Sequence, residues 1–397
     1  MAALSVEREM QQRWIFQLGT ARELCQAEVE AVVGVSSSLC PGLVEVQTLS
    51  VLDEQQAQTW QDRLGGTVKI ALGVDSLPKQ ADEEQISDKI SDYLLSLKQP
   101  KVRFAVGEWG RESKPVLDLS LVKEKLTQKG VKSRFCDNPR SGASAALLLH
   151  QQIVEILVIE TADTILLAQT KTVQNIDEWT KRDRAKPYAD RRKGMLPPKL
   201  ARIMVNLGVA GGKRVKVYDP FCGTGTILME AMMLGCPVCG SDSDVKAVLG
   251  SGENLEWLCE VEKISVSSQL LTREVTQVSA TDLGGQIPLI VTEPFLGRQT
   301  PGESQLPNVF RGLEKMYWGA LRAWSKLLTD QAKVVIVLPR VANKRGKVYN
   351  LESVLDKSQA LGYTRQSYGL YYARPGAVVQ REVCVLSFDR SQAQGAY

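Results

Sequence analysis

The strongest chemical signal in this sequence is an acidic residue followed at once by a glycine-rich turn. In residues 215–226, VKVYDPFCGTGT, Asp219 ends an apolar, β-branched run, and Gly223 and Gly225 come next. Glycine lets the backbone bend sharply and lets a ligand approach closely. The turn lacks the lysine of a P-loop and does not follow G-x-G-x-x-G. An acid beside a Gly-x-Gly turn suits a ligand with an amino group, a carboxylate and a ribose, as in S-adenosylmethionine; the alternative is a helix-capping turn with an incidental aspartate.

Further candidates follow the other strands expected in this region. In an open α/β sheet the ligand lies beyond the carboxyl ends of the strands. Asp242, in GSDSD, is placed to accept the ribose hydroxyls of an adenosine, although it could instead cap the next helix. Glu293 opens the stretch EPFLG after a fourth strand. The predicted cofactor-binding residues are Asp219, Pro220, Phe221, Cys222, Gly223, Gly225, Thr226, Asp242, Ser243, Ala280 and Thr281.

Alternating strands and helices from residue 196 onward predict the frame that positions these residues. The alternation is typical of an α/β fold with a doubly wound, mainly parallel sheet and an antiparallel hairpin at its edge. Two smaller α+β patterns precede it, and the first alternates as ferredoxin-like modules do. The strands expected in the C-terminal frame are residues 215–219, 237–242, 275–278, 288–292, 334–338, 366–372 and 380–388.

Residues 171–195 form a basic connector with Tyr188 among the charges. Such a composition suits contact with phosphates and an unstacked base. A solvated interdomain linker is the alternative, and Arg134 and Arg140, near an earlier polar turn, could likewise be ordinary surface charge. The predicted RNA-binding residues are Arg134, Arg140, Lys181, Arg182, Arg184, Lys186, Arg191 and Arg192.

The composition is that of an ordinary globular protein, with 44% hydrophobic and 24% charged residues and a net charge of +4. No signal peptide or membrane-length apolar run is evident, so we expect a cytoplasmic protein. Cys236 and Cys239 form a C-x-x-C without a second pair at zinc-ligand spacing, and His150 is the one histidine. We therefore expect no metal and assign any acid–base chemistry to carboxylates.

Three stretches together resemble a known family. DPFCGTGT, GSDSD with Asn254, and residues 181–208 are similar to the THUMP-domain S-adenosylmethionine-dependent tRNA guanosine N2-methyltransferases of the single-chain prokaryotic type. The resemblance covers nearly the whole chain. It implies a ferredoxin-like domain at residues 1–80, a THUMP domain at 81–170, a basic linker at 171–195 and a Rossmann-like methyltransferase domain at 196–397.

The resemblance also implies an activity, which is methylation of the exocyclic N2 amine of a guanosine in the tRNA core, at position 10. It implies S-adenosylmethionine as the cofactor and tRNA as the partner, with no membrane and no metal. We expect the chain to work alone; a small activating subunit is the alternative.

The stretch after the fourth strand departs from the family pattern. The family has Asp or Asn, then Pro, Pro and Tyr or Phe, whereas this chain has Glu293, Pro294, Phe295 and Leu296. Glu293 keeps a carboxylate that can hold the amine, and Phe295 keeps an aromatic side chain, shifted by one position. We therefore predict Glu293, Pro294 and Phe295 to be the catalytic residues. The alternatives are a methyltransferase acting on another RNA amine, such as a ribosomal RNA base or an adenine N6, and a tRNA-binding protein with a non-catalytic methyltransferase fold. Ser279 stands where the family commonly has an Asp near the adenine amine.

Overall fold

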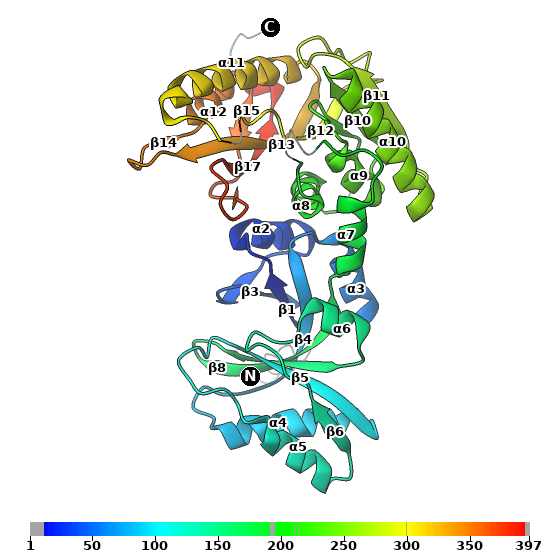
Figure 1. Cartoon of the computed structure of the whole chain (residues 1–397), viewed down its shortest axis with the longest axis vertical. Helices are drawn as coiled ribbons and strands as arrows, with labels where there is room; N and C mark the ends of the chain where they lie inside the picture. The colour runs from blue at the N-terminus through cyan, green and yellow to red at the C-terminus, as the bar shows by residue number, and fades with distance from the viewer. Residues whose placement is uncertain (1–11, 191–194, 210, 213, 299, 394–397) are drawn as a thin grey trace. The chain divides into compact units, whose positions relative to one another are not determined.

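The structure is a computed structural model that describes residues 12–190, 195–209, 211–212, 214–298 and 300–393. The chain divides into two compact units, residues 1–178 and 179–397 (Figure 1). The predicted Arg191 and Arg192 lie outside the described residues. Among the described helices, none is both long and apolar enough to cross a membrane.

The N-terminal unit is built on one eight-stranded sheet with the strand order β2-β3-β1-β4-β8-β7-β5-β6. The antiparallel pairing of β4 with β8 joins the two N-terminal patterns in a single sheet. The division of this region into two domains near residue 80 stays a prediction. The strands are β1 (Gln12–Leu18), β2 (Ser37–Cys40), β3 (Leu43–Thr48), β4 (Thr67–Pro78), β5 (Lys101–Trp109), β6 (Lys132–Phe135), β7 (Val154–Glu160) and β8 (Thr164–Val173). The helices are α2 (Arg22–Val32), α3 (Glu54–Arg63), α4 (Glu83–Ser96), α5 (Leu119–Gln128) and α6 (Ala145–His150), with α7 (Ile176–Arg184) following at the junction.

The C-terminal unit is built on a second sheet with the strand order β11-β10-β9-β12-β13-β17-β15. The strands from β11 to β13 are parallel, and β17 and its neighbours add antiparallel strands at one edge. This confirms the predicted α/β sheet. The strands are β9 (Val217–Asp219), β10 (Val238–Asp242), β11 (Ser268–Thr272), β12 (Ile287–Thr292), β13 (Leu328–Ala342), β14 (Val348–Tyr349), β15 (Tyr363–Arg365), β16 (Tyr371–Tyr372) and β17 (Gln380–Phe388). The α-helices are α8 (Pro198–Val209), α9 (Thr226–Met233), α10 (Val245–Glu262), α11 (Leu306–Trp324) and α12 (Glu352–Ser358).

Helix α11 shows why this unit folds as it does. Leu306, Phe310, Leu313 and Tyr317 recur at three- and four-residue steps, so they lie on one face of the helix. All four are buried in one hydrophobic cluster with residues of β12, β13 and β17. Packing this face on the sheet fixes the carboxyl ends of the parallel strands, where the candidate site residues lie.

Two of the predicted strands were wrong. Residues 275–278 form a turn, and the strand of this region is β11, earlier in the chain. Val275 and Val278 are buried although they lie in a turn, so their apolar character reflects burial alone. β11 is an edge strand of largely exposed residues, SQLLT, with no run of buried side chains to reveal it. The predicted strand at 366–372 is likewise reduced to β16, at residues 371–372.

Candidate active site at the carboxyl ends of the parallel strands

Three carboxylates lie at the ends of neighbouring strands in the C-terminal unit. Asp219 ends β9, Asp242 ends β10 and Glu293 directly follows β12. β9 pairs in parallel with both β10 and β12, so the three strands end at the same edge of the sheet. Burial raises the pKa of Asp219, and the charges of the nearby Asp242 and Glu293 add to that rise. The sheet topology therefore gathers negative charge at one place.

Asp219 is buried and ties β9 to β12. Thr292 Oγ1 donates to Asp219 Oδ1 at 2.6 Å, and the backbone N–H of Phe221 donates to the same oxygen at 3.1 Å. Burial, with smaller contributions from the charges of Asp242 and Glu293, raises the pKa of Asp219 to about 7, although the two hydrogen bonds act to lower it. The carboxyl group holds the turn after β9 in place.

We expect Asp219→Asn to change the pH dependence of stability. The pKa of Asp219 is higher in the folded protein than in the unfolded chain, so the unfolded chain releases this proton first. Stability therefore declines as pH rises from about 4 to about 7 and then levels off. Asparagine keeps an acceptor for Thr292 and carries no charge. The measurement is urea unfolding at pH 5, 6, 7 and 8. Across this range, the free energy of unfolding of the variant should rise by a few kcal/mol relative to that of the wild type.

The exposed Asp356→Asn on α12 is the control for a general charge effect. Parallel pH profiles for the wild type and Asp219→Asn would contradict the assignment of this pH dependence to Asp219.

The glycine turn has one closely packed side and one open side. Gly225 and Gly223 have φ angles of 76° and 50°, which favour glycine. A Cβ on Gly225 would lie 2.3 Å from Ser251 Oγ, so that glycine allows α10 to pack closely. A Cβ on Gly223 would meet nothing nearer than the carbonyl oxygen of Phe221, at 3.9 Å. The backbone at Gly223 is therefore open to a ligand.

Asp242 is oriented by the backbone on both sides. The N–H of Gly223 donates to its Oδ2 at 3.1 Å, and the N–H of Asp244 donates to its Oδ1 at 2.9 Å. The cap of α10 is Asp244, whose Oδ1 accepts from the N–H of Lys246 at 2.9 Å. Asp242 is thus not the helix cap, and its half-buried carboxylate retains lone pairs for a ligand.

The remaining predicted cofactor residues differ in their access to solvent. Pro220, Cys222 and Thr226 are buried, and burial raises the pKa of the Cys222 thiol well above its ordinary range. The exposed members are Ser243 and Thr281, and the half-buried members are Phe221 and Ala280.

Ser279, the second departure from the family pattern, is bound within its own turn. Its hydroxyl donates to Asp282 Oδ2 at 2.7 Å, and its N–H donates to the same oxygen at 2.9 Å. These bonds fix the turn that carries Ala280 and Thr281.

Glu293 forms an ion pair with an arginine that the sequence did not reveal. Arg381 Nε lies 2.5 Å from Glu293 Oε1, and each side chain is 14% exposed. Arg381 belongs to β17, opposite Pro339 of β13, so it reaches Glu293 across the sheet from 88 residues further along the chain. No local motif signals such a pair. The ion pair with Arg381 restricts the directions in which the Glu293 side chain can point, although that side chain is longer than the Asp or Asn of the family pattern.

The loop after Glu293 presents an aromatic ring. Phe295 is 61% exposed, whereas Pro294 is buried. The hydroxyl of Tyr317 donates to the carbonyl of Val337 at 3.0 Å and also lies 3.5 Å from the carbonyl of Phe295. An exposed ring beside a carboxylate can stack on a planar base while the carboxylate binds the edge of that base.

Two of the predicted RNA-binding residues are interior. Arg182 is 4% exposed and donates to Glu230 Oε1 at 2.9 Å, and Arg202 lies 2.7 Å from the other oxygen of Glu230. Lys186 is 5% exposed, donates to Thr226 Oγ1 at 3.1 Å, and has a pKa lowered by burial. Both side chains are thus buried against other residues of the C-terminal unit, which leaves them little surface for RNA, and their contact with RNA stays a prediction.

The connector also packs through Tyr188. The backbone N–H of Tyr188 donates to Asn254 Oδ1, and Asn254 Nδ2 donates to the carbonyls of Tyr188 and Thr224, all at 2.8–2.9 Å. A Cβ on Gly250 would lie 2.2 Å from the Tyr188 ring, so the ring lies directly against α10. Asn254 thus joins the connector to the glycine turn.

The other connector residues are more accessible. Arg184 is exposed, and the half-buried Lys181 lies 3.1 Å from Glu262.

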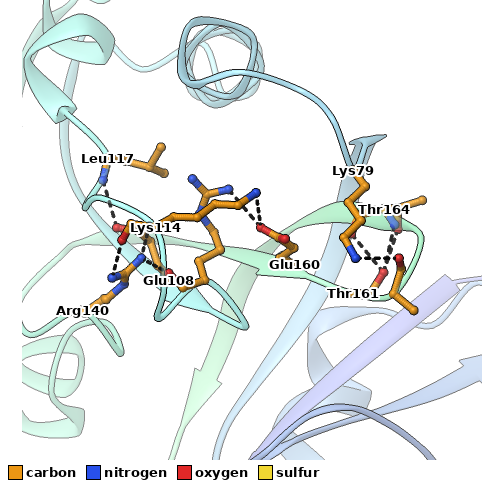
Figure 2. Close-up of polar contacts among 10 residues, drawn as sticks. Lys79, Glu108, Lys114, Leu117, Arg140, Glu160, Thr161 and Thr164 are labelled. Atoms are coloured by element: carbon orange, nitrogen blue, oxygen red, sulfur yellow. Dashed lines mark hydrogen bonds and ion pairs between the residues drawn. The ribbon is translucent and has the colours of Figure 1, made fainter.

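In the N-terminal unit, Arg134 is exposed and Arg140 is part of a charged cluster (Figure 2). Arg140 Nη1 donates to the carbonyl of Lys114 at 2.9 Å, and Nη2 donates to the carbonyl of Arg111 and lies 3.3 Å from Glu108. The guanidinium of Arg140 thus joins two loops. That Arg134 and Arg140 contact RNA stays a prediction.

Within the described part of the chain, no group of three His, Cys, Asp or Glu side chains could hold a metal ion. Cys236 and Cys239 are both buried.

The C-terminal unit resembles known proteins. Residues 187–350 match the protein family described as RMKL-like, methyltransferase domain. A tRNA (guanine(10)-N2)-dimethyltransferase of Methanothermobacter thermautotrophicus is 34% identical over 169 residues, which is 41% of this chain and 42% of that protein. A probable tRNA (guanine(10)-N2)-dimethyltransferase of Methanothermococcus thermolithotrophicus is 31% identical over 121 residues, which is 29% of this chain and 70% of that protein.

The match to solved structures extends further along the chain. The crystal structure of TrmN from Thermus thermophilus covers 95% of this chain and 99% of its own, with a TM-score of 0.55 and 19% identity, which shows a shared fold. This chain spans less than half the length of the first curated relatives it matches. The residues that match the family model, 187–350, include the three carboxylates. The chain belongs to the family of tRNA guanine-N2 methyltransferases.

Proposed function

We propose that this protein transfers a methyl group from S-adenosylmethionine to the N2 amine of the guanosine at position 10 of tRNA. The observation that carries the proposal is the gathering of Asp219, Asp242 and Glu293 at the ends of three adjacent strands. The family supports the same reaction, because its relatives bear the name tRNA (guanine(10)-N2)-dimethyltransferase.

The residues present fit the cofactor. S-adenosylmethionine supplies an electrophilic methyl group on a positively charged sulfur. Asp242 would accept the ribose hydroxyls, since its carboxylate is already oriented by two backbone N–H groups. The open side of Gly223 allows close approach of the ligand, and Ala280 and Thr281 lie in the turn proposed to flank the adenine. The negative charge of Asp242, beside the open side of the glycine turn, favours a ligand with cationic groups.

Glu293 would act on the target amine. The lone pair of guanine N2 is delocalised into the ring, so the amine is a weak nucleophile that must be held and aimed. Arg381 binds Oε1 of Glu293, and within the described residues Oε2 forms no hydrogen bond, so it can accept an amine N–H. S-adenosylmethionine would supply the methyl group to N2, and the proton that the amine loses would pass to Glu293 or to water. The exposed ring of Phe295 would stack on the base once it is extruded.

The N-terminal unit would capture the tRNA. We propose that residues 1–80 and 81–170 act as the ferredoxin-like and THUMP domains implied by the family resemblance. The exposed Arg134 in this unit and the exposed Arg184 in the connector are the best placed of the predicted RNA contacts.

We expect Arg381→Ala to lower kcat by about 10- to 100-fold, because the Glu293 side chain is then free to point away and small errors of placement are costly. The affinity for S-adenosylmethionine should be unchanged. Added guanidinium should restore part of the rate, which a purely structural role of Arg381 would not allow.

Arg365→Ala is the matched control, since Arg365 is a similarly buried arginine of the same sheet that pairs with Glu352 and Glu382. The Arg365→Ala protein should be less stable than the wild type, and added guanidinium should not raise its rate. An unchanged kcat in a folded Arg381→Ala protein would rule out the positioning role.

The proposed function is tested by the identity of the product. Unmodified tRNA transcripts are incubated with methyl-labelled S-adenosylmethionine, digested and separated into nucleosides. Label should appear in N2-methylguanosine or N2,N2-dimethylguanosine. Label in N6-methyladenosine, or tight tRNA binding without label, would contradict the proposal.

A further inference from the structure

A basic hairpin stands at the end of β13. We use this name for residues 340–349, which carry Arg340, Lys344, Arg345 and Lys347 and contain no aspartate or glutamate. β13 and β14 pair antiparallel across its base, and the three cations of the turn are exposed. Asn343 Oδ1 accepts from the N–H groups of Arg345 and Lys347 at 3.0 and 2.9 Å, so the turn is ordered. The basic side chains thus project from a hydrogen-bonded turn.

The hairpin projects at the same edge of the sheet as the candidate site. In the parallel pairing of β12 with β13, Thr292 lies opposite Ile336, and Glu293 follows Thr292. β13 continues beyond that level to Ala342, while β12 has ended. At about 3.3 Å per residue, the turn of the hairpin stands roughly 20 Å past the end of β12. Figure 1 shows the orange β13 running on to β14 at the margin of the C-terminal unit.

Two of the four hairpin cations lie beside aromatic rings. Lys347 Nζ lies 5.0 Å from the centre of the Tyr349 ring, and the Arg340 guanidinium lies 5.3 Å from the centre of the half-exposed Tyr371 ring. Glu303 meets the hairpin through the backbone N–H of Lys344, at 3.0 Å. Cation–π contacts hold basic side chains without neutralising them. The positive charge of these side chains therefore remains available to attract an anionic binding partner.

We propose that the basic hairpin binds backbone phosphates of the RNA substrate, next to the nucleotide held at Glu293. The proposal rests on the proposed function and adds to it a second RNA contact, within the catalytic unit itself. A span of roughly 20 Å matches about six steps of a stacked strand at ~3.4 Å each. Phosphates on the strand that carries the target base, or on the strand paired with it, can therefore reach the hairpin.

Phosphate contacts fix register and carry no base specificity. The hairpin would accordingly supply affinity and alignment, and Glu293 and Phe295 would act on the base. This division predicts that loss of the hairpin charges weakens RNA binding and leaves the chemical step intact.

The test is the triple variant Lys344→Gln, Arg345→Gln, Lys347→Gln in the full chain. Binding of an unmodified tRNA transcript is measured from 50 to 200 mM NaCl. Each lost phosphate contact removes about 0.7 to 0.9 from the slope of log affinity against log salt concentration, so the slope should shrink by about two to three. The KM for tRNA should rise, whereas kcat and the affinity for S-adenosylmethionine should stay within about twofold.

A second triple variant controls for net charge. This variant removes three positive charges from exposed residues of α11 and the segment after it, by Lys315→Gln, Arg322→Gln and Lys326→Gln. That segment leads to the amino-terminal end of β13, away from the carboxyl ends of the strands where the candidate site lies. For this variant, the slope of log affinity against log salt concentration and the KM for tRNA should match those of the wild type. Equal slopes for the two triple variants, or an unchanged slope in the hairpin variant, would overturn the proposal.

The two proposals fail in different ways. If the wild type binds tRNA but transfers no methyl group, the proposed function fails, and the salt slope still decides whether the hairpin contacts RNA. If methyl transfer proceeds and the hairpin variant keeps the wild-type slope and KM, the hairpin proposal alone is lost.

Discussion

Glu293→Gln is expected to lower kcat for methyl transfer by about 10²- to 10³-fold, which is the usual effect of removing one preorganised electrostatic group from a reacting centre. Glutamine has nearly the same shape but lacks the negative charge that stabilises the developing ammonium. It also breaks the ion pair with Arg381, which lies 2.5 Å from the Glu293 carboxylate. Single-turnover rates at saturating tRNA and S-adenosylmethionine would show the loss, and equilibrium binding of both ligands should remain within about twofold.

Two further variants sharpen this result. Glu293→Asp restores the acid commonly found in the family but shortens the reach to Arg381, so an intermediate rate is expected. Glu314→Gln on α11, whose carboxylate accepts from Ser353 Oγ at 3.1 Å, changes a carboxylate outside the site and should keep the wild-type rate. A Glu293→Gln protein with a rate within twofold of the wild type would show that the methyl-transfer step does not need this carboxylate.

Asp242→Ala is expected to weaken S-adenosylmethionine binding by about 100-fold or more. A hydrogen bond to a charged group contributes about 1.5–3 kcal/mol, and the carboxylate would form such bonds with the ribose hydroxyls. The variant also frees the N–H of Gly223, which now donates to Asp242 Oδ2, so the glycine turn loses one of its supports. Titration calorimetry with S-adenosylmethionine measures the effect directly.

Asp244→Ala is the control for a change in the same loop. Asp244 caps α10, and loss of such a cap costs about 1 kcal/mol of stability. Its removal should lower the unfolding midpoint with little change in cofactor affinity. Equal weakening of binding by Asp242→Ala and Asp244→Ala would mean that loop order, and not the Asp242 carboxylate, supports the ligand.

The sequence predicts the parts of the site that are local. Asp219, Asp242 and Glu293 each stand directly after an apolar strand, and parallel strands must end at a common edge, so strand pattern and topology together place them. Strand β17 was predicted with its observed bounds, because a buried strand leaves a run of apolar residues. The exposed edge strand β11 leaves no such run.

Long-range pairing is where sequence reasoning fails. Arg381 is joined to Glu293 by the order of β12, β13 and β17, which no spacing in the sequence records. Arg182 and Lys186 were predicted to contact RNA because of the basic run around them, yet both are buried against partners 48 and 40 residues away. Composition cannot distinguish a buried, paired cation from a solvated one, since the difference lies in its partner.

The central claim is that the chain methylates the N2 amine of guanosine 10 in tRNA. The most direct measurement compares two otherwise identical tRNAs, one with guanosine and one with inosine at position 10, as substrates for labelled S-adenosylmethionine. Inosine keeps the ring and its other edges and lacks only the exocyclic amine. The account predicts label on the guanosine tRNA and none on the inosine tRNA, with equal binding of both. Equal labelling of the two tRNAs would contradict it.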